Sequence, residues 1–298
     1  MLPVVPRPVV QMISHRYIAG RRLEDACRVV GRLNRGGKMA TVDVLGEEIT
    51  NPAEAEAIRV AYQDVLAAIE ENELDANVSV KLTALGLKLD YDLCGENLET
   101  VVADAAERGN FVRIDMEDSS CTDETLRMYR ELRDARYDNV GVVLQSRLGR
   151  TLDDVRGLAD LRPNVRLCKG IYLEPPDIAF QGYQEVRDNF VAALEELVAA
   201  GAYVGIATHD EWLIEQGGRL VAERELDPQE YEFQMLLGVR ERRADALVRE
   251  GHRLRVYVPF GEQWYEYSLR RLQENPKIAG YIAADTFNRV LHLGRDGR

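Results

Sequence analysis

Two arginines stand side by side in the short helical stretch GEQWYEYSLRRLQENP, residues 261–276. Adjacent helical residues point about 100° apart, so Arg270 and Arg271 alone are typical of a solvated helix face. Planar guanidinium groups also bind carboxylates through two parallel hydrogen bonds. If both side chains face one place, the chemistry they indicate is the binding of an anion.

Polar residues also recur near the ends of short apolar runs in the rest of the chain. A strand buried on both faces should be apolar, so a polar residue near its end needs a reason. Seven runs carry such residues, namely Lys81, Asp115, Gln145, Arg166 with Lys169, Thr208 with His209, Gln234, and Tyr257. One of them could be a satisfied polar group of the core. Seven strands that converge on one rim instead predict a polar pocket rich in cations.

The residue types leave several chemistries open. The chain contains neither the GxSxG motif nor a P-loop. Acidic and histidine side chains that could suggest a metal site are Asp115, Glu117, Asp118, His209 and Asp210. They lack HExxH or another tight ligand spacing, so we predict no metal. Lys81 and Lys169 at strand ends suggest a Schiff-base lyase, and a non-catalytic barrel that binds an anionic metabolite is a further alternative.

The elements that position these residues alternate regularly. Short runs rich in Val and Ile, typical of buried parallel strands, cover 39–45, 77–85, 111–117, 140–146, 165–172, 202–209, 231–237 and 253–260. Helical patterns such as 52–74 and 183–201 follow them. Eight such units predict an α/β protein with a closed (β/α)8 barrel, whose active site lies at the carboxyl ends of the strands. The alternative, a doubly wound open sheet, lacks its GxGxxG phosphate motif.

We expect one domain over residues 1–298, with an N-terminal helical arm at 1–36 and the barrel at 37–298. The formal net charge of −13 disfavours a nucleic-acid partner, because such a surface repels phosphates. None of the four cysteines forms a CxxC pair, which favours a reducing, intracellular compartment. No apolar run approaches the ~18 residues of a membrane-spanning helix, so a cytoplasmic location is predicted.

Six short motifs in order resemble the flavin-dependent proline dehydrogenases of the short, monofunctional bacterial type. They are VSVKLTALG, IDMED, VRLCKGIY, ATHD, YEFQMLLGV and YVPFG…YSLRRLQEN, and the resemblance covers about residues 12–290. It implies a distorted barrel that binds FAD and oxidises L-proline to Δ1-pyrroline-5-carboxylate, the first step of proline catabolism. It also implies electron transfer to a membrane quinone, with peripheral contact at the inner membrane face, and a pyrroline-5-carboxylate dehydrogenase as partner.

The resemblance assigns the substrate site. The last barrel helix would lie over the mouth, where Arg270, Arg271 and Lys81 would bind the proline carboxylate. Glu274, within one helical turn of both arginines, would orient their guanidinium groups. The residues that would wall the proline ring are Tyr172, Leu236, Tyr257 and Tyr267.

The cofactor site follows in the same way. Arg166 would lie near flavin N5, and Asp115 would hold Lys81 or Arg166 in place, which makes Asp115 and Arg166 the expected catalytic residues. Gln145 would bond the isoalloxazine edge. Further flavin contacts would come from Met116, Lys169, Gly170, Ile171, Thr208 and His209. Ile171 departs from the small residue common in the family, so its effect on local packing is open. We expect hydride transfer from the proline ring to flavin N5, at a rate that rises with pH toward the pKa of the bound amine.

Overall fold

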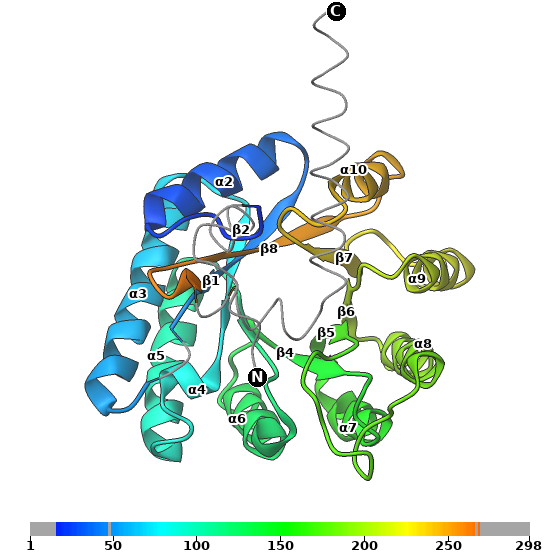
Figure 1. Cartoon of the computed structure of the whole chain (residues 1–298), viewed down its shortest axis with the longest axis horizontal. Helices are drawn as coiled ribbons and strands as arrows, with labels where there is room; N and C mark the ends of the chain where they lie inside the picture. The colour runs from blue at the N-terminus through cyan, green and yellow to red at the C-terminus, as the bar shows by residue number, and fades with distance from the viewer. Residues whose placement is uncertain (1–15, 47–48, 266–267, 269–298) are drawn as a thin grey trace, which may run out of the picture.

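Eight parallel strands close into a barrel in chain order in the computed structural model, which describes residues 16–46, 49–265 and 268 (Figure 1). The strands are β1 (Met39–Val44), β2 (Ala76–Val80), β3 (Val112–Ile114), β4 (Val140–Gln145), β5 (Asn164–Cys168), β6 (Tyr203–Ala207), β7 (Tyr231–Leu236) and β8 (Leu254–Phe260). Each predicted run overlaps one of them, and β2 and β5 begin one residue before their runs. The predicted (β/α)8 fold class is therefore confirmed.

Helices form a ring outside the strands (Figure 1). They are α2 (Leu23–Arg35), α3 (Pro52–Glu71), α4 (Leu82–Leu85), α5 (Tyr91–Glu107), α6 (Thr122–Asp134), α7 (Thr151–Leu158), α8 (Tyr183–Ala199), α9 (Glu211–Glu223) and α10 (Glu241–Arg249). Local signals set where they begin. The Asn51 side chain accepts a hydrogen bond from Glu54 N, with Pro52 next in the chain, and Asp90 accepts one from Leu93 N.

Three predicted strands were too long at their carboxyl ends, and the one predicted over 111–117 ends at Ile114. The run 77–85 ends as a strand at Val80, and its apolar second half forms the short helix α4, which stops at Gly86 with φ +115°. The run 165–172 ends as a strand at Cys168. Short apolar runs do not distinguish a strand from a buried helical turn by periodicity alone. These corrections place Lys81, Asp115 and Lys169 in the connections at the barrel mouth, while Arg166 stays on β5.

Side chains alternate along the strands, so that apolar ones face the helices and polar ones fill the barrel. Val78 and Val80 join the hydrophobic core with Leu66 of α3 and Leu98 of α5. Ser79, between them, instead bonds inside the barrel to Asp115, just beyond the neighbouring β3, and to Arg166 on β5. The hydrophobic core therefore lies between the strands and the helical ring, and the interior of the barrel is polar.

The segment before α2 lies along the end of β8. Ala19 N donates to Pro259 O at 2.9 Å, while Tyr17 and Ile18 pack with Leu45. α2 contacts both β8 and β1, and Figure 1 places it between α3 and α10. A regular barrel covers that part of the ring with the helix after its last strand. The predicted helix over 261–276 lies mostly outside the described residues. Its placement over the mouth, like the single domain over 1–298, stays a prediction.

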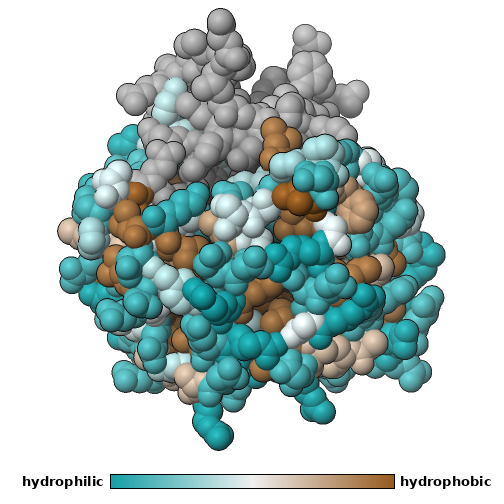
Figure 2. All heavy atoms as spheres, turned by 90° about the horizontal axis from the view of Figure 1, so that it is seen from below, coloured by the Kyte–Doolittle hydropathy of each residue, from teal (hydrophilic) through white to brown (hydrophobic). Residues whose placement is uncertain are grey.

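Hydrophilic residues cover most of the described surface on the side seen in Figure 2, with hydrophobic ones scattered between them. None of the helices in the described ranges has both the length and the apolar content needed to cross a bilayer.

Candidate active site

Asp115, just beyond β3, collects donors from three other strands. Its Oδ1 accepts hydrogen bonds from Arg166 Nη1 at 2.6 Å and from Ser79 Oγ at 2.6 Å. Its Oδ2 accepts the Tyr257 hydroxyl at 2.8 Å and lies 3.6 Å from Lys81 Nζ. Strands that are not neighbours in the sheet meet this way only inside the barrel. We call these five residues the upper network, because they lie toward the carboxyl ends of the strands.

Asp115 is negatively charged in this setting. Burial alone would raise the pKa of its carboxyl group, but Arg166 and Lys81, with the hydrogen bonds from Ser79 and Tyr257, hold that pKa below the usual value. A carboxylate that stays ionised near neutral pH anchors cations and does not supply protons. The structure therefore pairs Asp115 with both Lys81 and Arg166, which the sequence offered as alternatives.

Lys81, the residue after β2, is almost buried at 8% exposure. Its Nζ lies 2.9 Å from Asp43 Oδ1 and 3.2 Å from the Tyr257 hydroxyl. Asp43, on β1, is fully buried, and the sequence analysis missed it. The signal was present, because Asp43 is the one charged residue in the apolar run MATVDVL. The Tyr62 hydroxyl of α3 lies close by, 2.7 Å from Ser79 O and 3.3 Å from Asp43 Oδ1.

Arg166 is fixed at two of its three guanidinium nitrogens. Nε donates to Gln234 Oε1 at 2.5 Å, and Nη1 is shared between Asp115 and Ser79. Its Cζ lies 5.3 Å from the centre of the Tyr257 ring. Within the described ranges Nη2 makes no hydrogen bond. The side chain therefore has a fixed orientation and one amino group left for a ligand.

Gln145, Met116 and Gly170 lie together beside β4. Gln145 Nε2 donates to the carbonyls of Met116 at 3.1 Å and Glu117 at 2.8 Å, which leaves Oε1 as an acceptor. A Cβ atom on Gly170 would lie 2.6 Å from that oxygen, and Gly170 has φ +91°. Space and backbone conformation thus both require glycine.

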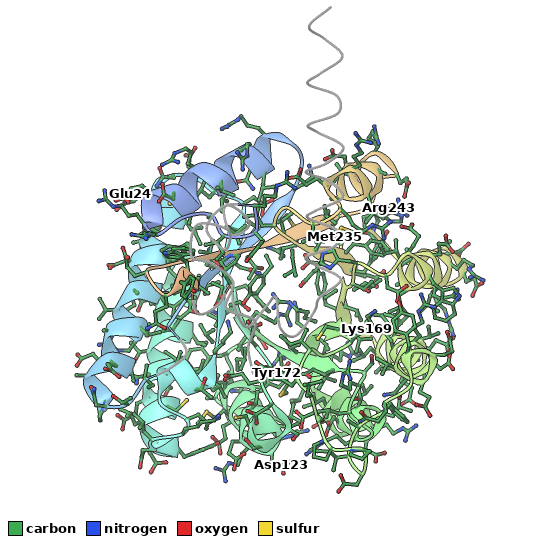
Figure 3. The ribbon with its side chains drawn as sticks, viewed as in Figure 1. Glu24, Asp123, Lys169, Tyr172, Met235 and Arg243 are labelled. Atoms are coloured by element: carbon green, nitrogen blue, oxygen red, sulfur yellow. The ribbon has the colours of Figure 1, made fainter. Side chains whose placement is uncertain are left out.

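Lys169 lies inside the ring of helices in Figure 3, held by Asp210. Asp210 accepts Lys169 Nζ at 3.1 Å, the Tyr183 hydroxyl at 2.6 Å, and Arg187 at 2.6 and 2.9 Å. Burial would raise the pKa of the Asp210 carboxyl, but the hydrogen bonds from Arg187, Tyr183 and Lys169 hold it far below its usual range. The charge of Lys169 is therefore balanced at the side of the mouth.

Thr208 and His209 are both engaged with the backbone. His209 Nε2 lies 2.9 Å from the backbone nitrogen of Leu236, so this ring nitrogen accepts that N–H. Thr208 Oγ1 accepts Asp210 N at 3.1 Å. The His209 bond connects the carboxyl ends of β6 and β7 at the mouth and brings Leu236 to the same rim.

A long connection from β5 to α8 carries Ile171 and Tyr172. Glu174 accepts hydrogen bonds from Ser119 N at 2.8 Å and Ser119 Oγ at 2.6 Å, which attaches this connection to the one after β3. Tyr172 lies inside the ring of helices (Figure 3). Ile171 is 37% exposed.

Four predicted substrate residues lie outside the described residues. They are Tyr267, Arg270, Arg271 and Glu274. The structure brings the remaining predicted residues to the carboxyl ends of the strands.

Known proteins match this chain over most of its length. The family model described as "Proline dehydrogenase" matches residues 26–284. "Proline dehydrogenase 1" of Bacillus subtilis subsp. natto is 37% identical over 269 residues, which cover 90% of this chain and 89% of the relative. "Proline dehydrogenase" of Deinococcus radiodurans is 36% identical over 294 residues, or 95% of each chain.

Solved structures share the fold. Proline utilization A (PutA) from Bdellovibrio bacteriovorus, described as inactivated by N-propargylglycine, superposes with a TM-score of 0.82 at 24% identity. The match covers 88% of this chain but spans only about a third, 32%, of that much longer protein. The family model and the two bacterial relatives go further than the fold, and this chain belongs to the proline dehydrogenase family of enzymes, as the six sequence motifs indicated.

Proposed function

We propose that this chain oxidises L-proline to Δ1-pyrroline-5-carboxylate with FAD as cofactor and a membrane quinone as electron acceptor. The observation that carries the proposal is the upper network, in which Lys81 and Arg166 share Asp115 at the mouth of the barrel. Family membership supports the activity. The cofactor, the electron acceptor and the roles of individual residues go beyond family membership and are part of the proposal.

The donors and acceptors beside β4 and β5 fit a flavin ring. Gln145 Oε1 is an acceptor for a ring N–H, and Arg166 Nη2 is a donor for a ring nitrogen or oxygen. Gly170 is partly exposed and has no side chain, so a flat ring could approach its backbone closely. When bound, FAD would supply the acceptor for the hydride from C5 of proline. The residues that would hold it are Met116, Gln145, Arg166, Lys169, Gly170, Ile171, Thr208 and His209.

Lys81 would bind the substrate carboxylate from the barrel side, with Arg270 and Arg271 as the other two cations. Asp43 and Asp115 hold the Lys81 ammonium group in place before substrate arrives, so little side-chain ordering remains to be done on binding. Glu274 would orient the two arginines. The walls of the ring pocket would be Tyr172, Leu236, Tyr257 and Tyr267. Because the carboxylate of proline would be held by the three cations, C5 of the proline ring would be positioned toward the flavin.

In the proposed reaction the group that must lose a proton is the amine of proline. The amine must be neutral when hydride leaves, because an ammonium nitrogen has no lone pair to donate. Asp115 stays ionised, accepts hydrogen bonds from three donors and forms an ion pair with Lys81, so it anchors Lys81 and Arg166 and does not serve as the base. The rate should therefore rise with pH toward the pKa of the bound amine.

The Schiff-base lyase becomes the weaker hypothesis on this geometry. Lys81 is paired with Asp43, and Lys169 with Asp210. Imine formation needs an amine that can reach a carbonyl carbon, and both lysines are instead held in ion pairs with buried or part-buried carboxylates.

Anaerobic addition of L-proline to the FAD-loaded protein tests the proposed function. The flavin absorbance should bleach, and it should return when a quinone is added. A protein that binds FAD but keeps its absorbance with proline would exclude the proposed reaction, whereas borohydride trapping of substrate on Lys81 or Lys169 would favour the lyase. A partner that consumes pyrroline-5-carboxylate would speed turnover in a coupled assay without changing the rate of bleaching.

A further inference from the structure

Gln234 lies between two charged groups inside the barrel. Its Oε1 accepts Arg166 Nε at 2.5 Å, and its Nε2 donates to Glu232 Oε1 at 2.5 Å. Glu232 and Gln234 are two positions apart on β7, so both side chains point to the same face of the strand. Gln234 therefore connects Arg166 to a second buried carboxylate deeper in the barrel.

Glu232 decides which way the carboxamide of Gln234 points. An ionised carboxylate only accepts hydrogen bonds, so the amide nitrogen must face it and the amide oxygen must face Arg166. Burial raises the pKa of Glu232, but Arg255 and the hydrogen bonds from Arg255 and Tyr203 bring it below the usual value. Glu232 thus stays charged, and the carboxamide has a single favourable orientation.

Glu232 is itself held rigidly at 1% exposure. Arg255 Nε donates to its Oε1 at 2.8 Å, and the Tyr203 hydroxyl donates to its Oε2 at 2.8 Å. We call Glu232, Arg255 and Tyr203 the lower network. The two oxygens of Glu232 have different partners. Oε1 accepts hydrogen bonds from Gln234 and Arg255, and Oε2 accepts one from Tyr203.

The neighbouring strand leaves room for this arrangement. Gly205 on β6 pairs with Arg166 on one side and with Glu232 on the other. A Cβ atom at Gly205 would collide with Gln234 Nε2. A glycine in a strand interior weakens the strand, so its presence here is explained by the close approach of the Gln234 carboxamide.

We propose that Gln234, oriented by Glu232, is a positioning residue that holds the Arg166 guanidinium in the orientation a bound flavin requires. This inference rests on the proposed function. Gln234 bonds to Nε of Arg166 and Asp115 bonds to its Nη1. These two bonds define the plane of the guanidinium, and therefore the direction in which Nη2 points. Without Gln234, Arg166 keeps its ion pair with Asp115 but can rotate about it.

The first test needs no cofactor. In FAD-free protein labelled with 15N-arginine, the Nε–H signal of Arg166 is assigned by its loss in Arg166→Lys. Gln234→Met, which keeps length but removes the acceptor, should speed solvent exchange of that proton at least tenfold. Glu232→Gln, which keeps shape but removes the charge, should speed it less. Tyr203→Phe is the matched control, because it changes only Oε2 of Glu232, and it should leave the exchange rate unchanged.

The second test uses the FAD-loaded protein. Gln234→Met should shift the equilibrium between oxidised and reduced flavin toward the oxidised form about tenfold, or about 30 mV for a two-electron couple. It should lower kcat about tenfold with KM for proline within twofold. Tyr203→Phe should match the parent protein in both measurements.

The outcomes separate the two proposals. If the parent protein bleaches with proline but Gln234→Met leaves both the Arg166 exchange rate and the flavin potential unchanged, the positioning role is wrong and the proposed function stands. If the parent protein does not bleach, the proposed function fails, and the exchange measurement still decides whether Gln234 holds Arg166.

Discussion

The upper and lower networks are built alike and differ in access. Each centres on a carboxylate whose pKa is lowered by an arginine, Asp115 by Arg166 and Glu232 by Arg255. The Asp115 side chain is 12% exposed, whereas that of Glu232 is 2% exposed. The upper network also contains Arg166 Nη2, which has no partner in the described ranges. Ion pairs thus support the barrel at two levels, and the level nearer the mouth is the more exposed of the two.

The largest expected effect breaks the lower network. Glu232→Ala leaves Arg255 without its carboxylate and removes the charge that offsets Arg113, a buried guanidinium whose pKa is lowered to about 9 by burial and by Arg166. The free energy of unfolding in urea should fall by about 3–5 kcal/mol. Glu230→Ala, an exposed position on the same stretch, should change it little. A loss for Glu232→Ala below about 1 kcal/mol would contradict a structural role for the lower network.

The next effect belongs to the upper network. Arg166→Lys keeps the charge but loses the fork that reaches Gln234 and Asp115 together. Proline-dependent flavin reduction should slow by about 10²–10³-fold, the typical loss when one donor to a developing charge is removed. Arg28→Lys, at a side chain that is 72% exposed, is the control. A rate within threefold of the parent would show that Arg166 does not act on the reaction.

Lys81→Met tests whether the upper network, unlike the lower one, contributes to the binding of proline. Loss of a charged contact to the substrate carboxylate should raise KM for proline about 10–100-fold, corresponding to about 1.5–3 kcal/mol. The matched change in the lower network, Arg255→Met, should leave KM unaltered in whatever fraction of the protein folds. Equal effects on KM from the two variants would remove the distinction between the networks.

Asp115 and Glu232 should both contribute to the pH dependence of the free energy of unfolding. A carboxyl group with a lowered folded-state pKa stabilises the protein above its unfolded-state pKa of about 4, and that contribution disappears as pH falls through the folded value. Asp115→Asn should therefore flatten the acid side of the stability curve, by at most about 1.4 kcal/mol per pH unit for one proton. Asp138→Asn, an exposed carboxylate at 86% exposure, should leave that slope in place. The comparison requires unfolding curves between pH 3 and pH 7.

The smallest effect concerns Tyr203. Tyr203→Phe removes one hydrogen bond to Glu232 and should cost about 1 kcal/mol of unfolding free energy, with kcat and KM unchanged. A clear fall in kcat would show that the lower network reaches the reaction through more than Gln234.

The eight strands could be predicted because apolar runs and helical patterns alternate so regularly. Lys81, Asp115 and Tyr257 could be placed at the mouth because strand ends of a parallel barrel share one edge. Asp43, Ser79 and Glu232 could not be assigned in the same way. A polar residue inside a strand run can face either the helices or the barrel, and its partner depends on closure of the sheet. α4 escaped prediction because its four residues are as apolar as the strand before it.

The upper network also constrains how the chain folds. Tyr257 is 142 positions from Asp115 and 176 from Lys81, so its two bonds join the first strands of the barrel to the last. Contacts so distant along the chain form slowly, because the entropy of closing the intervening loop is lost before they are made. The site therefore cannot exist in a half-formed barrel. During refolding, proline-dependent bleaching should return only after helical circular dichroism has recovered, which makes catalysis a reporter of barrel closure.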